Sequence, residues 1–400
     1  MTAFYRKPLY RARQALMARL MAKPQPKPMT FIGAGAVGQL CAALAQFGHR
    51  RVLIVTDKML HDLGALDPAI KALGDNGVTS VVYDGVLPDP TEQIVDDGIA
   101  QYREHNCDAL LAFGGGSSID AAKVIALAVA NNKQAADCVG FGKCDAPAAP
   151  LYAVPSTSGT GSEATFIAVI SNNETHSKGG VIDPSIIPRA AALDPEVSRG
   201  LPAHITAATG IDALTHAIES YIGRWGNHET DNFGLTACRL IFDYLPRACR
   251  DGNDMEAREA MSLASYYGGL AITNALVGYV HAISHNLGGK YGVPHGLGNA
   301  LALPHVLTLM KSHAADKLAD IAEHCGLGTR GEGDSALAKR LIERVQQLND
   351  EVGIPRTTDV IKAEDIDELV AAMLAEGGNY PVPRFLSDAE VRNILAAISA

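Results

Sequence analysis

Acidic and imidazole side chains recur at helical spacing in the second half of the chain. Asp212 and His216 stand at positions i and i+4, and so do His281 and His285, so each pair projects from one face of a predicted helix. His295 follows after a break of glycines and a proline. A lone buried histidine is usually a core residue, but one carboxylate with two or three imidazoles suits a divalent ion such as Fe²⁺ or Zn²⁺. The spacing therefore predicts a metal site.

The stretch 260–310 around these histidines is almost free of formal charge. Lys290 is its one charged residue, although it holds four of the 13 histidines of the chain. Such an apolar run raises the question of a membrane span, but glycines, a proline and polar side chains interrupt it. We therefore expect buried helices around a polar site, and no membrane span.

Three segments rich in glycine and hydroxyl groups could hold the phosphates of a nucleotide. The first, 33–38, reads GAGAVG and matches the dinucleotide pattern GxGxxG, with Asp57 at the end of the next predicted strand. The second, 114–118, reads GGGSS and opens a predicted helix, whose positive end favours an anion. The third, 155–163, reads PSTSGTGSE. The first two cannot hold the same pyrophosphate, and these patterns alone do not decide between them.

The elements that carry these motifs change in type along the chain. Short apolar or β-branched runs alternate with helical segments, at 51–56, 79–83, 109–113 and 151–154. This alternation predicts a parallel sheet covered on both faces. Beyond residue 201 the strand signals fade and long Ala/Leu-rich segments take over. We therefore expect a basic N-terminal extension over 1–28, an α/β dinucleotide-binding domain over 29–200 and an all-helical metal-binding domain over 201–400.

Composition and charge narrow the class of protein further. Lys and Arg number 34 against 44 Asp and Glu, a net charge of −10, which excludes a general nucleic-acid binder. The stretch 1–56 has nine Lys or Arg and no acid, and begins with a predicted basic helical arm and a Lys-Pro spacer. Seven widely spaced cysteines without a CxxC pair, and no visible signal peptide, predict a cytoplasmic protein without a disulfide framework.

Five motifs, in order, resemble those of the iron-containing (group III) alcohol dehydrogenase family. They are Thr56-Asp57 at a strand end, GGGSxxDxxK at 114–123, PTxxGTGSE with Ser156 in place of its first Thr at 155–163, DALTHxxE at 212–219 and HxxxHxLGxxxxxPHG at 281–296. The resemblance covers residues 28–307 well. It implies the dehydroquinate synthase-like architecture of that family, an α/β N-terminal dinucleotide-binding domain with a parallel sheet and an all-α C-terminal domain, with the site in the cleft between them.

The resemblance also implies roles for individual residues. The metal ligands would be Asp212, His216, His281 and His295, and His285 would lie beside nicotinamide and substrate as a catalytic residue in proton relay. The cofactor-binding residues would be Asp57, Asp89, Gly114, Gly115, Gly116, Ser117, Ser118, Thr157, Ser158, Thr160, Thr165 and Lys178. Asp89 stands where the family commonly has Asn. The segment 33–38 becomes only the turn into the first helix of the domain.

The implied activity is that of a metal-dependent alcohol dehydrogenase, with hydride transfer between a primary alcohol or aldehyde and NAD(H). A carboxylate at Asp57 suits ribose hydroxyls and repels a 2′-phosphate, which favours NAD over NADP. Fe²⁺ is expected, with Zn²⁺, Ni²⁺ or Co²⁺ as alternatives. A homodimer or higher homo-oligomer is expected, without a nucleic-acid or membrane partner. A glycerol- or diol-type dehydrogenase, and less readily a metallohydrolase or lyase with the same His/Asp site, are the alternatives.

Overall fold

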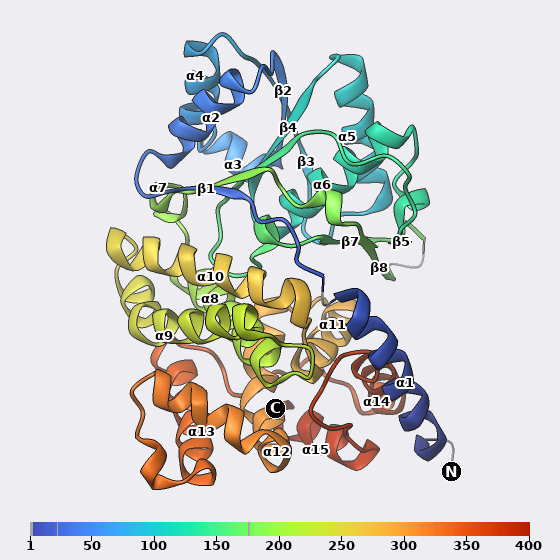
Figure 1. Cartoon of the computed structure of the whole chain (residues 1–400), viewed down its shortest axis with the longest axis vertical. Helices are drawn as coiled ribbons and strands as arrows, with labels where there is room; N and C mark the ends of the chain where they lie inside the picture. The colour runs from blue at the N-terminus through green and yellow to red at the C-terminus, as the bar shows by residue number, and fades with distance from the viewer. Residues whose placement is uncertain (1–2, 22, 175–176) are drawn as a thin grey trace. The chain divides into compact units, whose positions relative to one another are not determined.

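The four strands predicted from the sequence lie in one parallel sheet, which two further strands extend to six, in a computed structural model that describes residues 3–21, 23–174 and 177–400 (Figure 1). Their order across the sheet is β1-β9-β6-β4-β2-β3, and every neighbouring pair is parallel. Their bounds are β1 Met29–Ile32, β2 Arg51–Asp57, β3 Thr79–Val86, β4 Ala109–Gly114, β6 Leu151–Pro155 and β9 Ala190–Leu193. The predicted α/β fold class is confirmed.

Helices cover both faces of this sheet. Leu53 and Val55 of β2 belong to a core that includes α5 (Glu92–Glu104) and α6 (Gly116–Asn131). Val52 and Ile54 of the same strand belong to a second core, with α2 (Ala36–Gln46) and α4 (Asp67–Asp75). Successive side chains of a strand point to opposite faces, so a strand buried on both faces reads as a continuous apolar run.

A small second sheet was not predicted from the sequence. It has the order β5-β8-β7, with bounds β5 Gly140–Phe141, β7 Ile167–Ser171 and β8 Lys178–Ile182. Strands this short, two of them containing glycine, give little periodic signal. The remaining short helices of this part of the chain are α3 Lys58–Asp62, α7 Pro195–Ser198, η1 Ala136–Cys138, η2 Ser162–Ala164 and η3 Pro184–Ile186.

The carboxyl ends of β2 and β4 mark the point where the strand order reverses. These two strands are neighbours, while β3 lies beyond β2 and β6 lies beyond β4. Chain connections therefore leave the two strands in opposite directions, which opens a crevice for ligands in sheets of this type. Asp57 ends β2 and Gly114 ends β4, so both predicted cofactor residues reach this edge.

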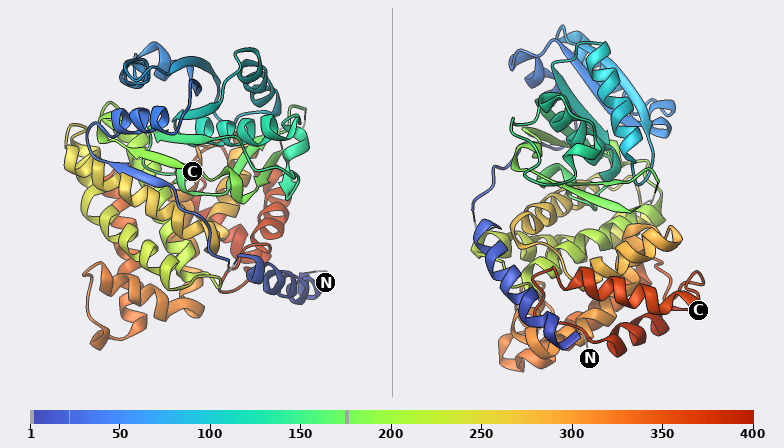
Figure 2. Two further views of the ribbon diagram at one scale, coloured as in Figure 1. Left: turned by 45° about the horizontal axis from the view of Figure 1, so that its top comes forward. Right: turned by 90° about the vertical axis from the view of Figure 1, so that its right-hand side faces the viewer.

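The second half of the chain is helical, as predicted (Figures 1 and 2). Pro202–Ala400 form one compact unit together with the described residues up to Pro24, and Gln25–Leu201 form the other. The helices of the former, here the helical unit, are α1 Ala3–Met21, α8 Ala203–Ile222, α9 His228–Arg250, α10 Met255–Ala275, α11 Tyr279–Tyr291, α12 His295–His324, α13 Asp334–Glu351, α14 Ile366–Gly377 and α15 Asp388–Ile398, with the short η4 Arg330–Glu332 and η5 Ala363–Asp365.

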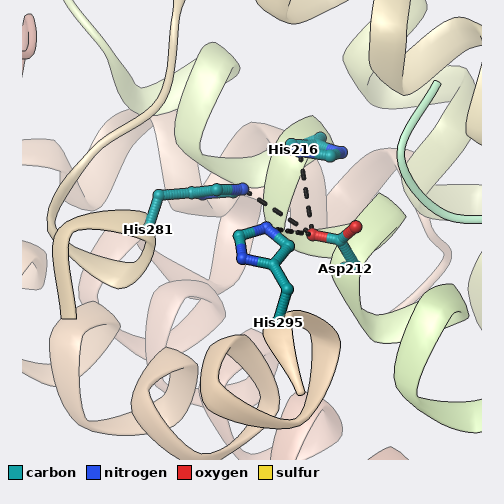
Figure 3. A group of neighbouring side chains, drawn as sticks. All are labelled: Asp212, His216, His281 and His295. Atoms are coloured by element: carbon teal, nitrogen blue, oxygen red, sulfur yellow. Dashed lines mark ion pairs between the residues drawn. The ribbon is translucent and has the colours of Figure 1, made fainter. Parts of the chain in front are cut away.

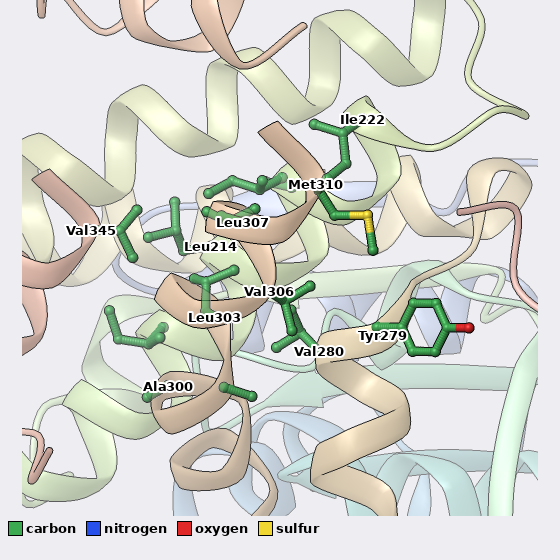
Figure 4. Packing of buried hydrophobic residues seen from close by; sticks show 14 of the residues in the cluster. Leu214, Ile222, Tyr279, Val280, Ala300, Leu303, Val306, Leu307, Met310 and Val345 are labelled. Carbon is green, nitrogen blue, oxygen red and sulfur yellow. The ribbon is translucent and has the colours of Figure 1, made fainter. Parts of the chain in front are cut away.

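An aliphatic core joins α8, α11, α12 and α13 within the helical unit (Figure 4). Leu214 of α8, Val280 of α11, Leu303 of α12 and Val345 of α13 are all fully buried in it. Burial of each such side chain contributes about 1.5–3 kcal/mol relative to exposure. This core holds together the three helices that carry the predicted metal ligands.

The charge-poor stretch 260–310 supplies much of α10, all of α11 and the first half of α12. Within the described ranges of the chain, no helix has both the length and the apolar character needed to cross a membrane.

Two buried charged side chains, Lys123 and Glu163, and the half-buried Asp120 lie around Ser162. Lys123 of α6 donates to Ser162 Oγ at 3.0 Å and to Thr165 Oγ1 at 2.8 Å, and Asp120 accepts from the backbone of β7. Glu163 is 1% exposed, and neither carboxylate oxygen accepts a hydrogen bond from another described residue. Burial raises the pKa of Glu163 to about 7, and burial lowers the pKa of Lys123 to about 8.

Replacement of Glu163 should therefore change how stability depends on pH. Between its ordinary pKa of 4.5 and a folded pKa of about 7, the folded chain holds a proton that the unfolded chain has lost. Rising pH in this window thus lowers the free energy of unfolding, by up to about 3 kcal/mol. Glu163→Gln should remove that loss, measured by urea unfolding at about pH 5 and about pH 8. The exposed Glu104→Gln is the control, and equal pH slopes for wild type and Glu163→Gln would contradict the prediction.

A close approach of two backbones sets the position of α12 against α8. A Cβ added to Gly296, the second residue of α12, would lie 2.3 Å from the carbonyl oxygen of Ala208. Only glycine fits here without a shift of one helix.

Gly296→Ala should accordingly lower the melting temperature by several degrees, because the clash is with backbone and not with a flexible side chain. Gly289→Ala in α11 is the matched control: a Cβ there meets nothing within 4 Å. It should leave the melting temperature unchanged or raise it, because alanine stabilises a helix interior by up to about 1 kcal/mol relative to glycine. Calorimetry measures the melting temperatures of both variants. Equal melting temperatures would contradict the prediction that the backbone contact at Gly296 limits the distance between α8 and α12.

Candidate metal centre and cofactor cradle

Helix α8 carries the first two predicted metal ligands. Asp212 and His216 lie one turn apart on it and are 2% and 5% exposed. Ile211, Leu214 and Ile218 fill the apolar face of the same helix in the core. The i, i+4 spacing therefore places a carboxylate and an imidazole side by side in an interior position, as the sequence predicts.

The other two predicted ligands stand near the starts of two successive helices. His281 is in the first turn of α11, and His295 is the first residue of α12. Gly292, at φ 68°, ends α11 in the left-handed conformation that glycine tolerates, and Pro294 precedes α12. The glycine and proline break seen in the sequence thus turns the chain so that His295 returns towards His281, with ring centroids 5.3 Å apart.

The four side chains converge on one point (Figure 3). Asp212 Oδ1 lies 3.7 Å from Nε2 of His216, 3.7 Å from Nε2 of His281 and 3.3 Å from Nε2 of His295. Ligand bonds of about 2.1 Å place the donors of a tetrahedral metal about 3.4 Å apart. One carboxylate and three imidazoles, spaced in this way and largely buried, fit a divalent transition metal.

The electrostatics of the cluster follow from its burial. Burial by itself would raise the pKa of Asp212, but the facing histidines hold that pKa well below its usual range. Burial likewise opposes a proton on His281, yet the carboxylates of Asp212 and Glu219 raise its pKa to about 9. The site therefore has a strong affinity for positive charge between these side chains, which a divalent cation satisfies.

Two supporting residues were not assigned from the sequence. Glu219 Oε2 accepts from His281 Nδ1 at 2.7 Å and from Gly278 N at 2.8 Å, so His281 Nε2 is directed at the cluster. Asn299 is fully buried and donates to Asp212 Oδ1 at 2.7 Å. The spacing contained a signal for both, because Glu219 follows Asp212 and His216 on one face of α8 and Asn299 stands four residues after His295.

His285, the predicted catalytic residue, lies beside the cluster and outside the group of converging donors. Its ring is 5.1 Å from that of His295 and nearly parallel to it. Its Nδ1 lies 2.6 Å from Glu376 Oε1, and its side chain is 29% exposed. An imidazole that is both accessible and adjacent to the four donors can exchange a proton with a group bound there.

The two glycine-rich helix starts of the α/β unit differ in what they face. At α2, which follows 33–38, the backbone N–H of Val37 donates to the buried carboxylate of Asp194 at 3.1 Å. At α6 the N-cap is Gly115, and no side chain caps it. A carboxylate already occupies the anion position of α2, whereas α6 presents its amides to a ligand. The geometry thus agrees with the assignment of the phosphate site to 114–118.

The second and third glycine motifs meet around the start of α6. A Cβ on Gly115 would lie 3.4 Å from Thr157 Cγ2, and a Cβ on Gly116 would lie 2.7 Å from Thr160 Cγ2. Gly114 has φ 155°, and a Cβ there would strike Ser118. Gly115 and Gly116 therefore lie against Thr157 and Thr160 and form with them a cradle, which tolerates no larger side chain at Gly116 without rearrangement.

The remaining predicted cofactor residues occupy three places. Asp57 Oδ1 accepts from Leu60 N at 2.9 Å and so caps α3. Asp89 has φ 54°, a conformation that Asp and Asn tolerate better than most residues, and its Oδ1 lies 2.6 Å from Lys178 Nζ. Thr165 is 6% exposed and accepts from the buried Lys123. The structure therefore pairs Asp89 with Lys178 and buries Thr165 against Lys123.

Comparison with known proteins identifies the family. Residues 27–195 match the family model described as iron-containing alcohol dehydrogenase, and residues 206–399 match that of its C-terminal domain. An NAD-dependent methanol dehydrogenase of Bacillus methanolicus is 38% identical over 92% of this chain and 97% of its own length. A 1,3-propanediol dehydrogenase of Citrobacter freundii is 37% identical over 92% of this chain and 96% of its own length.

Solved structures agree with this result. A 1,3-propanediol oxidoreductase superposes with a TM-score of 0.90 at 35% identity and covers 94% of this chain and 99% of its own. A sulfoacetaldehyde reductase of Bifidobacterium kashiwanohense, in complex with NAD⁺, superposes with a TM-score of 0.86 at 27% identity, over 94% and 98% of the two chains. The family and enzyme class expected from the five motifs are confirmed: this chain belongs to the iron-containing alcohol dehydrogenases and is an oxidoreductase.

Proposed function

We propose that this chain oxidises primary alcohols and reduces the corresponding aldehydes with NAD(H), at divalent iron held by Asp212, His216, His281 and His295. The observation that carries the proposal is the convergence of three imidazole nitrogens on one buried carboxylate oxygen. Iron is proposed because the family is described as iron-containing, and the names of the methanol and propanediol dehydrogenases support the substrate class. The donor set also suits Zn²⁺, Ni²⁺ or Co²⁺, so availability decides which ion is bound.

The two domains have different roles: residues 29–200 bind the cofactor, and residues 201–400 bind the metal. A bound divalent ion supplies Lewis-acid polarisation of the substrate oxygen, and bound NAD supplies the hydride acceptor. Glu219 and Asn299 hold the ligands in place, and His285 exchanges the substrate proton. The charge-poor stretch 260–310 surrounds these groups with apolar helices, which strengthens electrostatic interactions within the site.

The cradle at the start of α6 holds the cofactor pyrophosphate. Gly114, Gly115, Gly116, Ser117 and Ser118 present amides and hydroxyls to it. Thr157, Ser158, Thr160 and Thr165 lie along the cofactor, and Lys178 reaches a ribose. The ion pair between Lys178 and Asp89 orients the lysine for that contact. Asp57 hydrogen-bonds the adenosine ribose hydroxyls, and its charge disfavours NADP.

Assembly and location complete the proposal. We expect a homodimer or higher homo-oligomer in the cytoplasm, on the resemblance of the motifs to the family. The seven cysteines are all free thiols, which suits a reducing compartment. Sedimentation analysis of the purified chain measures its oligomeric state.

A substrate panel tests the activity itself. The purified chain, loaded with Fe²⁺ without oxygen, is mixed with NAD and a series of primary alcohols, and the absorbance of reduced nicotinamide is followed. Turnover with at least one alcohol or aldehyde is expected. No change of absorbance with any of them would overturn the proposal.

Loss of a metal ligand should remove metal and turnover together. His281→Ala deletes one of the four metal donors, so metal content by elemental analysis should fall to near zero. Turnover should fall at least about 1,000-fold. The matched control is His313→Ala, an exposed histidine of α12. Retained metal and turnover in His281→Ala would reject its role as a ligand.

Cofactor preference should respond to the charge at residue 57. Asp57→Asn and Asp57→Ser both remove the carboxylate but keep an N-cap for α3, so the melting temperature should change little. The kcat/KM ratio of NADP to NAD should rise at least about tenfold in both, because repulsion of the 2′-phosphate is lost. Steady-state kinetics with each cofactor measures the ratio. An unchanged ratio in two stable variants would show that another group selects NAD.

A further inference from the structure

Glu376 is the hydrogen-bond partner of His285. Its Oε1 lies 2.6 Å from His285 Nδ1, and it stands near the end of α14, about ninety residues further along the chain. Tyr380 OH donates to the same oxygen at 2.8 Å, and Asn286 Nδ2 donates to Oε2 at 2.8 Å. Two further donors thus hold the carboxylate against the imidazole.

The charge of this carboxylate is favoured where it stands. Burial by itself would raise the pKa of Glu376, but the hydrogen bonds from His285, Tyr380 and Asn286 outweigh burial and lower it. An ionised carboxylate can only accept, so His285 Nδ1 carries the proton of this hydrogen bond. His285 Nε2 is then the nitrogen left to accept a proton from a bound group.

The segment that follows Glu376 is held by the N-terminal helix α1. Gln14 Nε2 donates to the carbonyls of Gly378, at 3.0 Å, and of Tyr380. Arg11 donates to Val382 O at 2.9 Å and to Pro383 O at 3.1 Å. These four carbonyls belong to the loop that carries Tyr380, so α1 fixes the backbone from which the Tyr380 hydroxyl reaches Glu376.

Close packing adds to these hydrogen bonds. The Arg11 guanidinium lies 4.2 Å from the ring centroid of Phe385, and the Tyr10 ring is 5.9 Å from the same centroid. A Cβ added to Gly378 would lie 2.8 Å from the Tyr10 ring. Figures 1 and 2 show α1 alongside the C-terminal helices in each view. Side-chain packing therefore reinforces the hydrogen bonds between α1 and this part of the chain.

Helix α1 lies outside the part of the chain that defines the family. The matching family model begins at residue 27, whereas α1 ends at Met21. The basic extension thus precedes the segment that the family model matches, and its contacts lead to a residue beside the metal centre.

We propose that Glu376 is the positioning residue of His285, and that α1 holds Glu376 in place through the loop 378–383. The inference rests on the proposed function, in which His285 exchanges the substrate proton. The network keeps His285 in the tautomer with the proton on Nδ1 and Nε2 directed away from Glu376. The N-terminal extension then acts as a support of the active site.

The tautomer can be read without turnover. Metal-free protein with ¹⁵N-labelled histidine is studied by long-range proton–nitrogen NMR at about pH 8, where an unperturbed imidazole is neutral, and His285→Asn assigns the resonance. In wild type, His285 should show a protonated Nδ1 and an unprotonated Nε2. Glu376→Ala should shift the proton towards Nε2. Glu368→Ala, a carboxylate 71% exposed on the same helix, should leave the spectrum of His285 unchanged.

Kinetics of the loaded enzyme supply a second measurement. Glu376→Ala should lower kcat at least about tenfold with KM within about twofold, since proton transfer is affected and binding is not. Glu376→Asp keeps the charge and should recover most of the lost kcat. Should Glu376→Ala not fold, Tyr380→Phe removes one donor from Glu376 and should move the spectrum in the same direction by less. An unchanged His285 tautomer in whichever variant folds overturns the proposal.

The role of α1 is tested by removing its contacts. The double variant Arg11→Ala with Gln14→Ala should shift the His285 resonances in the direction seen for Glu376→Ala and lower kcat about threefold or more. Arg19→Ala, an exposed residue of the same helix, is the control. Wild-type resonances and kcat in the double variant would overturn the part played by α1. A wild-type enzyme inactive on every alcohol would defeat the proposed function alone, because the NMR comparison still decides the role of Glu376.

Discussion

The convergence of three imidazoles on the buried carboxylate of Asp212 is the constraint on which the helical unit depends. A buried charge is costly unless it is paired and hydrogen-bonded, and Asp212 meets this condition through the histidines and the Asn299 amide. The imidazoles must come from α8, α11 and α12, so these helices have to pack closely, down to the backbone contact at Gly296. The helices that supply these imidazoles come largely from 260–310, where Lys290 is the one formal charge. The polar cluster therefore lies among helices with almost no competing charge.

In the α/β unit the corresponding constraint is a helix N-terminus left open to an anion. Two glycine-rich turns compete for this role, and their sequences look equally suitable. The buried Asp194 favours the second of them as the phosphate site, because its carboxylate accepts from Val37 at the start of α2. The start of α6 has no such cap, and it emerges where the strand order reverses. A phosphate at α2 would have to displace a buried carboxylate, whereas at α6 it meets free amide dipoles. The distinction comes from a residue more than 150 positions away.

Whether the sequence predicts a feature depends in the same way on how far apart along the chain the interacting residues lie. The i, i+4 spacings and the alternation of strands and helices are local, so they predicted the fold class and a metal site with one carboxylate and two or three imidazoles. The resemblance to the family was needed to choose His295, and not His285, as the fourth ligand. The role of Glu219 could have been predicted from the sequence, since Glu219 lies on the same helical face as Asp212 and His216. The short glycine-containing strands of the second sheet gave no periodic signal. Glu376 could not be found by spacing, because its contact with His285 depends on how α14 packs against α11. The motifs thus contain the ligands, while most of what orients them comes from tertiary packing.

Helix α1 extends this argument to the end of the chain. Its sequence is basic and acid-free, features that by themselves are typical of a solvated arm. In the structure Arg11 and Gln14 are used as hydrogen-bond donors to backbone carbonyls, and carbonyls need donors, not opposite charges. A helix rich in donors and free of carboxylates suits a loop that presents successive carbonyls and no acidic side chain between 377 and 385. The charge asymmetry of the first 56 residues is therefore explained in part by what the arm binds within its own chain, and only the side chains turned away from the loop remain to give it a basic surface.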